Sequence, residues 1–227
     1  MAAPFWPPHQ PLPVGSARLP ELHSSEKHAV SPRYDRASIS RVAENVQPYG
    51  VDLFISGMEG ASNLALLHAN DIGIVVNCAV NLDLDFVDQP LSPPGQAVAY
   101  GYSPIRYYKL GLIDGDGNPD TMLLAGYYLL KGALEQVLPD KPSYPMRGGR
   151  NVLLNCRAGR SRSAILASLF LWQTEPARFP SLEAALDQVR QRRELHPDEW
   201  FETPKPVLIA AARRAGAWAG MIEASGH

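Results

Sequence analysis

Several short stretches of the chain either alternate between apolar and polar residues or are continuously apolar, as β-strands are. These stretches are 51–56, 72–78, 106–113 and 152–154. Longer stretches with helical periodicity are 62–68, 122–138, 164–172, 181–190 and 206–218. Ser62 and Ser181 are placed to cap the first and fourth of these helices. Strands that alternate with helices predict an α/β fold, in which helices flank both faces of a central, mostly parallel sheet.

The strand at 152–154 and the helix at 164–172 enclose the most informative part of the pattern. The helix is apolar on nearly every side, which predicts that it is buried in the middle of a domain. Between strand and helix lies a tight turn, residues 156–162, that is rich in small and basic side chains. A loop at a helix N-terminus collects unpaired backbone N–H groups and can bind an anion. The helix N-terminus and the neighbouring arginines also favour the thiolate form of Cys156.

The spacing within this turn predicts what the loop holds. Five residues separate Cys156 from Arg162, so the loop can curl around one tetrahedral oxyanion. The guanidinium of Arg162 can then return and bind two of its oxygens. Gly159 permits backbone angles and close approaches that a Cβ atom would hinder. Ser163 places a hydroxyl near the sulfur, where it can help the thiolate to leave in a second step.

With this motif, Cys-x-Ala-Gly-x-Ser-Arg-Ser, the chain resembles the cysteine-dependent protein tyrosine phosphatases, and in particular the dual-specificity branch. The resemblance covers roughly residues 38–215 and implies a phosphate-monoester hydrolase that needs no metal and no cofactor. It implies that Cys156 is the nucleophile that forms a phosphocysteine, and that Arg162 stabilises the transferring phosphoryl group. The phosphate-binding loop would consist of Arg157, Ala158, Gly159, Arg160 and Ser161. The chain departs from the family at Asn155, where a His is usual; an amide can form hydrogen bonds but carries no charge, which affects the expected pH optimum.

A second loop, residues 114–120, contains carboxylates and glycines and has three interpretations. It lacks the spaced oxygens and the final Glu of an EF-hand calcium loop. It can be a plain turn with a helix cap at Asp120 or Thr121. By the resemblance it is the acid loop, whose Asp protonates the leaving oxygen. The alignment of the preceding strand favours Asp114 as this acid, with Asp116 as the alternative.

Two further features are tied to the loop by the resemblance. Cys78 ends a central strand, so it is either an inert buried thiol or the partner of Cys156 in a disulfide that protects the nucleophile from over-oxidation. The segment with Arg193, His196 and Trp200 corresponds to a turn that we expect to pack behind the phosphate loop rather than to contact substrate.

Composition narrows the class of protein. A chain of 227 residues with 45% hydrophobic residues can build one substantial core. Its net charge of −2 gives no general attraction to nucleic acid. Two cysteines make a disulfide-built secreted scaffold a poor description, and no signal peptide or membrane-spanning run is visible. We therefore expect a cytoplasmic protein.

The predicted domain organisation follows from the proline content. Residues 1–32 are rich in proline with little periodicity, which predicts an extended or flexible arm. Residues 33–227 then form the catalytic domain. Within it, residues 83–104 are expected to be a long loop at the rim of the site.

The substrate class stays open at this point. Arg157 and Arg160 are basic at positions that resemble phosphatases of inositol phospholipids and of phosphatidylglycerophosphate, although either side chain could face outward or pair with a carboxylate. The candidates are therefore a phosphorylated protein and a small polyanionic phosphate ester; Arg160→Ala should harm turnover of the second more. A rhodanese-type sulfurtransferase and an inactive phosphate-binding module are the alternatives of other classes.

Overall fold

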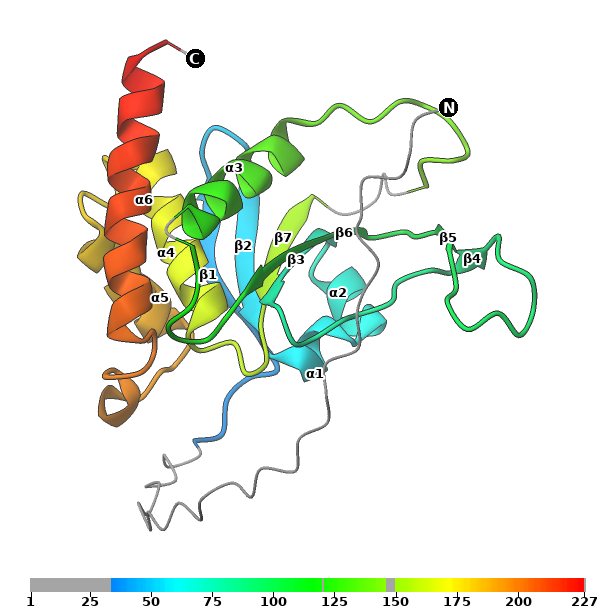
Figure 1. Cartoon of the computed structure of the whole chain (residues 1–227), viewed down its shortest axis with the longest axis horizontal. Coiled ribbons are helices and arrows are strands. Elements are labelled where there is room, and N and C mark those ends of the chain that lie inside the picture. Colours follow the sequence, from blue (N-terminus) through cyan, green and yellow to red (C-terminus); the bar gives the residue numbers. More distant parts are fainter. Residues whose placement is uncertain (1–33, 120, 146–149, 227) are drawn as a thin grey trace, which may run out of the picture. The chain divides into compact units, whose positions relative to one another are not determined.

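A five-stranded sheet, four of whose strands run parallel, forms the centre of the described structure (Figure 1). The computed structural model describes residues 34–119, 121–145 and 150–226. Across the sheet the strands are β1 (Ile39–Val46), β2 (Val51–Ser56), β7 (Asn151–Asn155), β3 (Ile72–Ala79) and β6 (Arg106–Leu112). The strand β1 is antiparallel to β2 at one edge. The predicted mostly parallel α/β sheet is confirmed.

Helices cover both faces of this sheet. Alternate residues of the central strands point to opposite sides, and because they are apolar on both sides, both faces must be buried. Leu53 and Ile55 belong to the larger hydrophobic cluster, on the side of α3 (Met122–Glu135), α4 (Arg162–Thr174), α5 (Leu182–Arg192) and α6 (Pro206–Ala224). Phe54, between them, belongs to a smaller cluster with Ala61 and Leu67, from α1 (Met58–Ala61) and α2 (Leu64–Ala69). Two buried faces explain why the central strands are apolar almost throughout.

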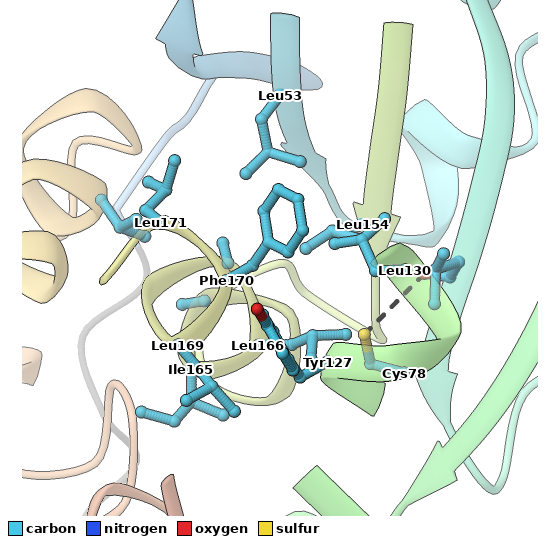
Figure 2. Close-up of a cluster of buried hydrophobic side chains, with 14 of the residues drawn as sticks. Leu53, Cys78, Tyr127, Leu130, Leu154, Ile165, Leu166, Leu169, Phe170 and Leu171 are labelled. Carbon is cyan, nitrogen blue, oxygen red and sulfur yellow. Dashed lines mark hydrogen bonds between the residues drawn. The ribbon is translucent and has the colours of Figure 1, made fainter. Parts of the chain in front are cut away.

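The helix α4 lies at the centre of the larger cluster. Every residue from Arg162 to Leu171 is buried, as the apolar sequence predicts. Figure 2 shows Phe170 of α4 between Leu53 of β2 and Tyr127 of α3. Truncating a buried Phe to Ala typically costs about 3–5 kcal/mol of unfolding free energy. This packing fixes the position of the α4 N-terminus, and with it the end of the loop that begins at Cys156.

Several predicted boundaries differ from those of the structure. The cap of α2 is Asn63, whose side chain accepts a hydrogen bond from the amide of Leu66, so the prediction of Ser62 was wrong. Ser62 is instead the last, capping residue of the preceding helix α1. The cap at Ser181 is confirmed, because its hydroxyl accepts from the amide of Ala184.

Other elements were missed or misjudged in length. The strand β1 was not predicted, and the helix α6 extends past 218 to Ala224. The helix α3 ends at Glu135, earlier than the expected residue 138. The long loop at 83–104 contains a short hairpin of β4 (Gln89–Pro90) and β5 (Gly101–Tyr102). A 3-10 helix, η1 (Pro197–Glu199), precedes α6.

The proline-rich arm predicted for residues 1–32 lies outside the described residues. Within the part of the chain that the structure describes, no helix is both long enough and apolar enough to cross a membrane.

Candidate active site

The candidate site residues lie where the parallel strands end. Cys156 follows β7, and Gly57 follows the neighbouring strand β2. On the other side of β7, Asn81 lies two residues beyond β3, and Asp114 lies two residues beyond β6. Because carboxyl ends of parallel strands share one edge of a sheet, these loops lie together at that edge, the usual place for a ligand in such a fold.

The loop of residues 156–162 packs directly against the turn after β2. The amide of Met58 donates to the carbonyl of Arg157 at 3.1 Å. Gly159 has φ +66°, and a Cβ atom built on it would lie 2.5 Å from the carbonyl carbon of Ser56. Both the left-handed backbone and this close approach require glycine. The predicted reason for Gly159 is therefore confirmed, and its immediate neighbour is the β2 backbone.

The thiol of Cys156 is buried, with 2% of the residue exposed. Its sulfur lies 3.3 Å from the Ser163 hydroxyl; either atom could donate to the other, but only Ser163 can donate to a thiolate. Burial by itself raises the pKa of Cys156, yet the pKa is lowered overall. The opposing causes are hydrogen bonds from the Ser163 hydroxyl and amide, the charge of Arg162, and the amide of Arg160. The surroundings of this cysteine therefore favour the nucleophilic thiolate.

Arg162 is held on one edge and left open on another. Its Nη1 donates to Oδ1 of Asn81 at 3.0 Å and to the carbonyl of Leu112 at 3.3 Å. Its Nε is buried and has no hydrogen-bond partner among the described residues. A buried donor without a partner carries an energetic cost of about 1–3 kcal/mol that a bound acceptor would relieve. This open edge is suited to an anionic ligand of the loop.

Asp114 approaches Arg162 from the acid loop. Its Oδ2 lies 4.0 Å from Nε of Arg162, and its side chain is 41% exposed. Lys205 Nζ donates to the Asp114 carbonyl at 2.9 Å. The Asn118 side chain braces the same loop, since it accepts from the Ile113 amide and donates to the carbonyl of Gly115. The carboxylate of Asp114 is thus presented beside the phosphate loop by a backbone held from two sides.

The alternative acid, Asp116, is exposed farther along this loop. Within the described residues, no ion pair joins Asp116 to the phosphate loop. Asp120, one of the expected cap residues, lies outside the described residues, and Thr121 makes no capping hydrogen bond with its side chain. Nowhere in the described ranges do three His, Cys, Asp or Glu side chains gather so that they could hold a metal ion.

An open depression of about 600 Å³ adjoins the acid loop. Its lining comes from that loop and from the segment that leads into α6: Ile113, Asp114, Gly115, Asp116, Phe201, Glu202, Lys205, Pro206 and Val207. Phe201 is 67% exposed there.

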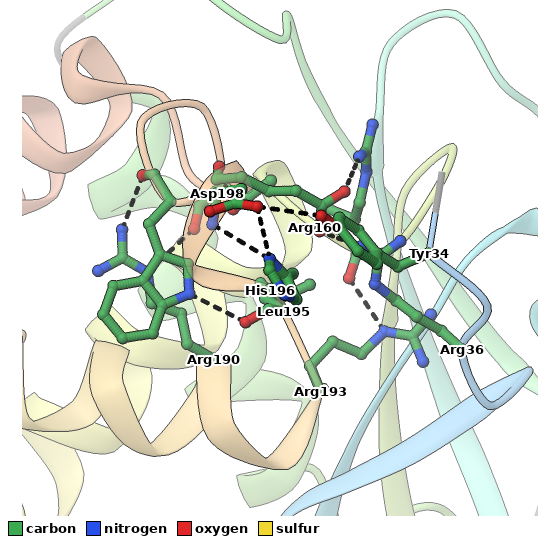
Figure 3. A network of polar contacts seen from close by, with 12 residues as sticks. Tyr34, Arg36, Arg160, Arg190, Arg193, Leu195, His196 and Asp198 are labelled. Atoms are coloured by element: carbon green, nitrogen blue, oxygen red, sulfur yellow. Dashed lines mark hydrogen bonds and ion pairs between the residues drawn. The ribbon is translucent and has the colours of Figure 1, made fainter. Parts of the chain in front are cut away.

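The outer side of the phosphate loop contains an ion-pair network that sequence reasoning missed in part (Figure 3). Arg160 Nη1 donates to Oε1 of Glu199 at 2.7 Å, and Arg36 donates to Oε2 of the same carboxylate. Arg193, which was predicted to pack behind the loop, donates to the carbonyl of Gly159 at 3.1 Å. Of the two options for the Arg160 side chain, pairing with a carboxylate is the one observed. Arg157 is exposed.

No protein-family model and no curated protein matches the sequence. Solved structures do match. Human DUSP28 superposes with a TM-score of 0.53 at 17% identity, over 80% of this chain and 98% of that one. The phosphatase domain of Yvh1 from Chaetomium thermophilum gives 0.50 at 18% identity, over 81% and 96%. The human tyrosine phosphatase-like serine/threonine/tyrosine-interacting protein gives 0.50 at 19%, over 80% and 97%.

The chain has the dual-specificity phosphatase fold. At these identities the likeness concerns the fold, so the expected architecture is confirmed, whereas activity is a separate question. One of the similar structures is itself named only phosphatase-like.

Within this dual-specificity phosphatase fold, Cys78 lies in the larger hydrophobic cluster (Figure 2). Its thiol is fully buried and donates weakly to the carbonyl of Val76 at 3.8 Å. Burial raises the pKa of Cys78, and the nearby Cys156 raises it further. Both thiols are free. The structure describes a buried, free thiol, and a disulfide with Cys156 stays a hypothesis that peroxide treatment and mass spectrometry can test.

Asn155 occupies the position before the cysteine in the dual-specificity phosphatase fold. Its side chain is fully buried, and neither amide atom has a hydrogen-bond partner among the described residues. Buried amides normally find partners. Asn155 therefore places a buried, polar and uncharged side chain next to the nucleophile.

Proposed function

We propose that the chain is a phosphate-monoester hydrolase that works through a phosphocysteine, and that its substrates are phosphorylated proteins, as for a protein tyrosine or dual-specificity phosphatase. One observation carries the proposal. A thiol with a lowered pKa, Cys156, lies within a loop at a helix N-terminus, and the open edge of Arg162 and the carboxylate of Asp114 lie beside that loop. These are the nucleophile, the anion binder and the acid that phosphoryl transfer needs.

In the first step, the Cys156 thiolate attacks phosphorus and forms an S–P bond while the ester P–O bond breaks. Asp114 gives its proton to the leaving oxygen, so an alcohol or phenol departs rather than an alkoxide. Arg162 and the amides of residues 157–162 bind the equatorial oxygens as their charge redistributes. The anchoring of Arg162 by Asn81 keeps its guanidinium in place for this task.

In the second step, water attacks the phosphocysteine and the S–P bond breaks. Asp114, now a carboxylate, takes a proton from the water, which yields inorganic phosphate. Ser163 donates its hydroxyl hydrogen bond to the departing thiolate, consistent with its distance of 3.3 Å from the sulfur. The cycle consumes one water per ester and leaves the enzyme unchanged.

The choice of a protein substrate over a polyanionic one is supported by Arg160. Its guanidinium is committed to Glu199 and is 28% exposed, which leaves Arg157 as the exposed extra cation of the loop. A site for several phosphate groups needs several available cations. The location in the cytoplasm and the catalytic-domain boundary at residue 33 stay predictions.

The test is hydrolysis of an aryl phosphate by the full chain and by Cys156→Ser, with chelator and with vanadate. We expect turnover that resists the chelator, is inhibited by vanadate, and falls at least about 10⁴-fold in the variant. Phosphotyrosine peptides and phosphoinositides are then compared directly. Phosphate binding without turnover by the wild-type chain would favour the inactive binding module, and thiocyanate formation from thiosulfate would favour the sulfurtransferase.

A further inference from the structure

The carboxylate of Glu199 is fully buried at the outer side of the phosphate loop. The 3-10 helix η1 holds it there, because the Glu199 amide donates to the carbonyl of His196 at 2.9 Å. The Thr203 hydroxyl donates to the carbonyl of Glu199 at 2.6 Å. A buried carboxylate on so fixed a backbone is costly unless cations and hydrogen-bond donors surround it.

Each oxygen of this carboxylate is bound by a different arginine. Oε1 accepts from Arg160 of the phosphate loop, and Oε2 accepts from Arg36, in the segment before β1. Figure 3 shows Arg160 and Arg36 converging there, with Arg193 close by. Glu199 is thus the shared partner of two arginines that would otherwise repel each other.

Arg193 makes a second connection between the same parts of the chain. Its Nε donates to the carbonyl of Gly159, and its Nη1 donates to the carbonyl of Ala37 at 2.6 Å and to Oγ of Ser40 at 2.9 Å. Burial lowers the pKa of Arg193 to about 10, which leaves it charged at neutral pH. The outer side of the phosphate loop is therefore bound at two adjacent residues, Gly159 by Arg193 and Arg160 by Glu199.

These contacts from Glu199 and Arg193 bear on catalysis because Arg160 also belongs to the loop that surrounds Cys156. While the side chain of Arg160 is paired with Glu199 at 2.7 Å, its backbone amide belongs to the loop around Cys156 and is one of the groups that lower the pKa of this thiol. The amide nitrogen is bonded to the Cα atom that carries the side chain, so a shift of the side chain would tilt the rigid peptide plane that contains this amide. The geometry at the nucleophile is consequently coupled to an ion pair that lies on the outer side of the loop.

We propose that Glu199 is a positioning residue of the phosphatase, which acts through Arg160 to hold the amide of the phosphate loop against the sulfur of Cys156. The proposal rests on the proposed function, but its consequence for the thiol does not require turnover. If Arg160 contacted substrate and its ion pair with Glu199 had no further role, breaking the ion pair would leave the pKa of Cys156 unchanged.

The experiment measures the rate of alkylation of Cys156 by iodoacetamide against pH, followed at its own peptide by mass spectrometry. We expect Glu199→Gln to move the midpoint to higher pH by about one unit, because a thiolate that loses a hydrogen-bond donor has a raised pKa. Arg160→Gln should produce the same shift. The double variant should shift no further than either single variant, since both changes break one coupling. Turnover should fall about 10- to 100-fold in each, in kcat more than in KM.

Two controls separate positioning from loosening of the fold. Arg36→Gln removes the other partner of Glu199 and leaves the pair with Arg160; it should lower the melting temperature while it shifts the alkylation midpoint by less than half as much. Glu183→Gln breaks an exposed ion pair with Arg213 and should leave the midpoint unchanged. If Glu199→Gln does not fold, Arg160→Gln carries the test, because Glu199 keeps Arg36 as a partner.

The proposal is overturned if the alkylation profile of folded Glu199→Gln or Arg160→Gln coincides with that of the wild-type chain. It is also overturned if the shifts of the single variants add in the double variant, or if Arg36→Gln shifts the midpoint as much as Glu199→Gln. A wild-type chain without turnover would refute the proposed function alone, since the alkylation readout would still be measurable.

Discussion

The two sides of the phosphate loop differ in how their polar groups are satisfied. On the outer side, the side chain of Arg160 and the carbonyl of Gly159 both have partners, Glu199 and Arg193. On the inner side, around Cys156, Nε of Arg162 is buried without a hydrogen-bond partner, and the Asp114 carboxylate lies 4.0 Å from it. The loop itself is therefore satisfied on its outer side and has a donor without a hydrogen-bond partner on its inner side; farther out in the outer network, Nε of Arg36 is also without one.

This difference separates the groups that hold the loop in place from the groups that are available to bind a ligand. Polar groups that are satisfied within the protein hold the loop in one conformation, whereas a buried group without a partner raises the free energy of the folded state until something binds it. A phosphoryl group would supply the acceptor that Nε of Arg162 lacks. We therefore assign substrate binding to the inner side and positioning to the outer side.

The largest change on the inner side should come from Asp114→Asn. An amide cannot give up a proton to the leaving oxygen, so kcat should fall by about 10²–10⁴-fold for alkyl or tyrosyl phosphates. The loss should be smaller for an aryl phosphate with an acidic leaving group, which leaves without protonation. Steady-state kinetics with both kinds of ester measure this.

Asp116→Asn is the matched control for that experiment, because it removes the neighbouring carboxylate of the same loop. It should leave kcat nearly unchanged. The assignment of the acid fails if Asp116→Asn shows the large loss and Asp114→Asn does not.

A smaller effect is expected from Ser163→Ala. The Ser163 hydroxyl helps to lower the pKa of Cys156, so its removal should raise this pKa and move the acidic limb of kcat/KM upward by about one pH unit. The pH–rate profile measures the shift. Ser168→Ala is the control, because Ser168 is also buried on α4 but donates to the carbonyl of Ala164; an equal shift there would contradict a direct role for Ser163.

The smallest effect concerns stability, on the outer side. Burial opposes ionisation of Glu199, but hydrogen bonds from Arg36 and Arg160 outweigh it, and its pKa lies below the ordinary value of 4.5. Stability from this carboxylate is therefore present above pH 4.5 and is lost as the pH falls through the lowered pKa. Melting temperatures recorded down to acidic pH should fall less steeply for Glu199→Gln than for the wild-type chain. Parallel curves would show that the outer network contributes nothing to acid stability.

Much of the fold follows from local patterns in the sequence. The buried central strands and α4 are apolar on both sides, so periodicity and length reveal them. The strand β1 escaped prediction because it lies at the sheet edge, where Arg41 and Glu44 face solvent and interrupt the pattern. The cap of α2 was misplaced because Ser62 and Asn63 are adjacent and both suit a cap.

The candidate site divides in the same way. Cys156, Arg162 and Ser163 lie within eight consecutive residues, so the motif could be recognised without a structure. Glu199 and Arg36 could not be paired from the sequence, because they lie 163 residues apart. The segment around Glu199 was expected to pack behind the loop, but nothing in it singled out this carboxylate. From its position in the loop, Arg160 could contact substrate, face outward or pair with a carboxylate, and its partner Glu199 is identified only by the folded chain.

The central claim is that Cys156 carries the phosphoryl group. Its most direct test is to mix Asp114→Asn with an aryl phosphate that has an acidic leaving group, quench in acid within one turnover, and analyse the peptides by mass spectrometry. With the base of the second step removed, we predict that the peptide containing Cys156 gains the mass of one phosphoryl group, and that Cys156→Ser gains none. A chain that hydrolyses the ester without labelling Cys156, or that carries the label on another residue, would contradict the mechanism.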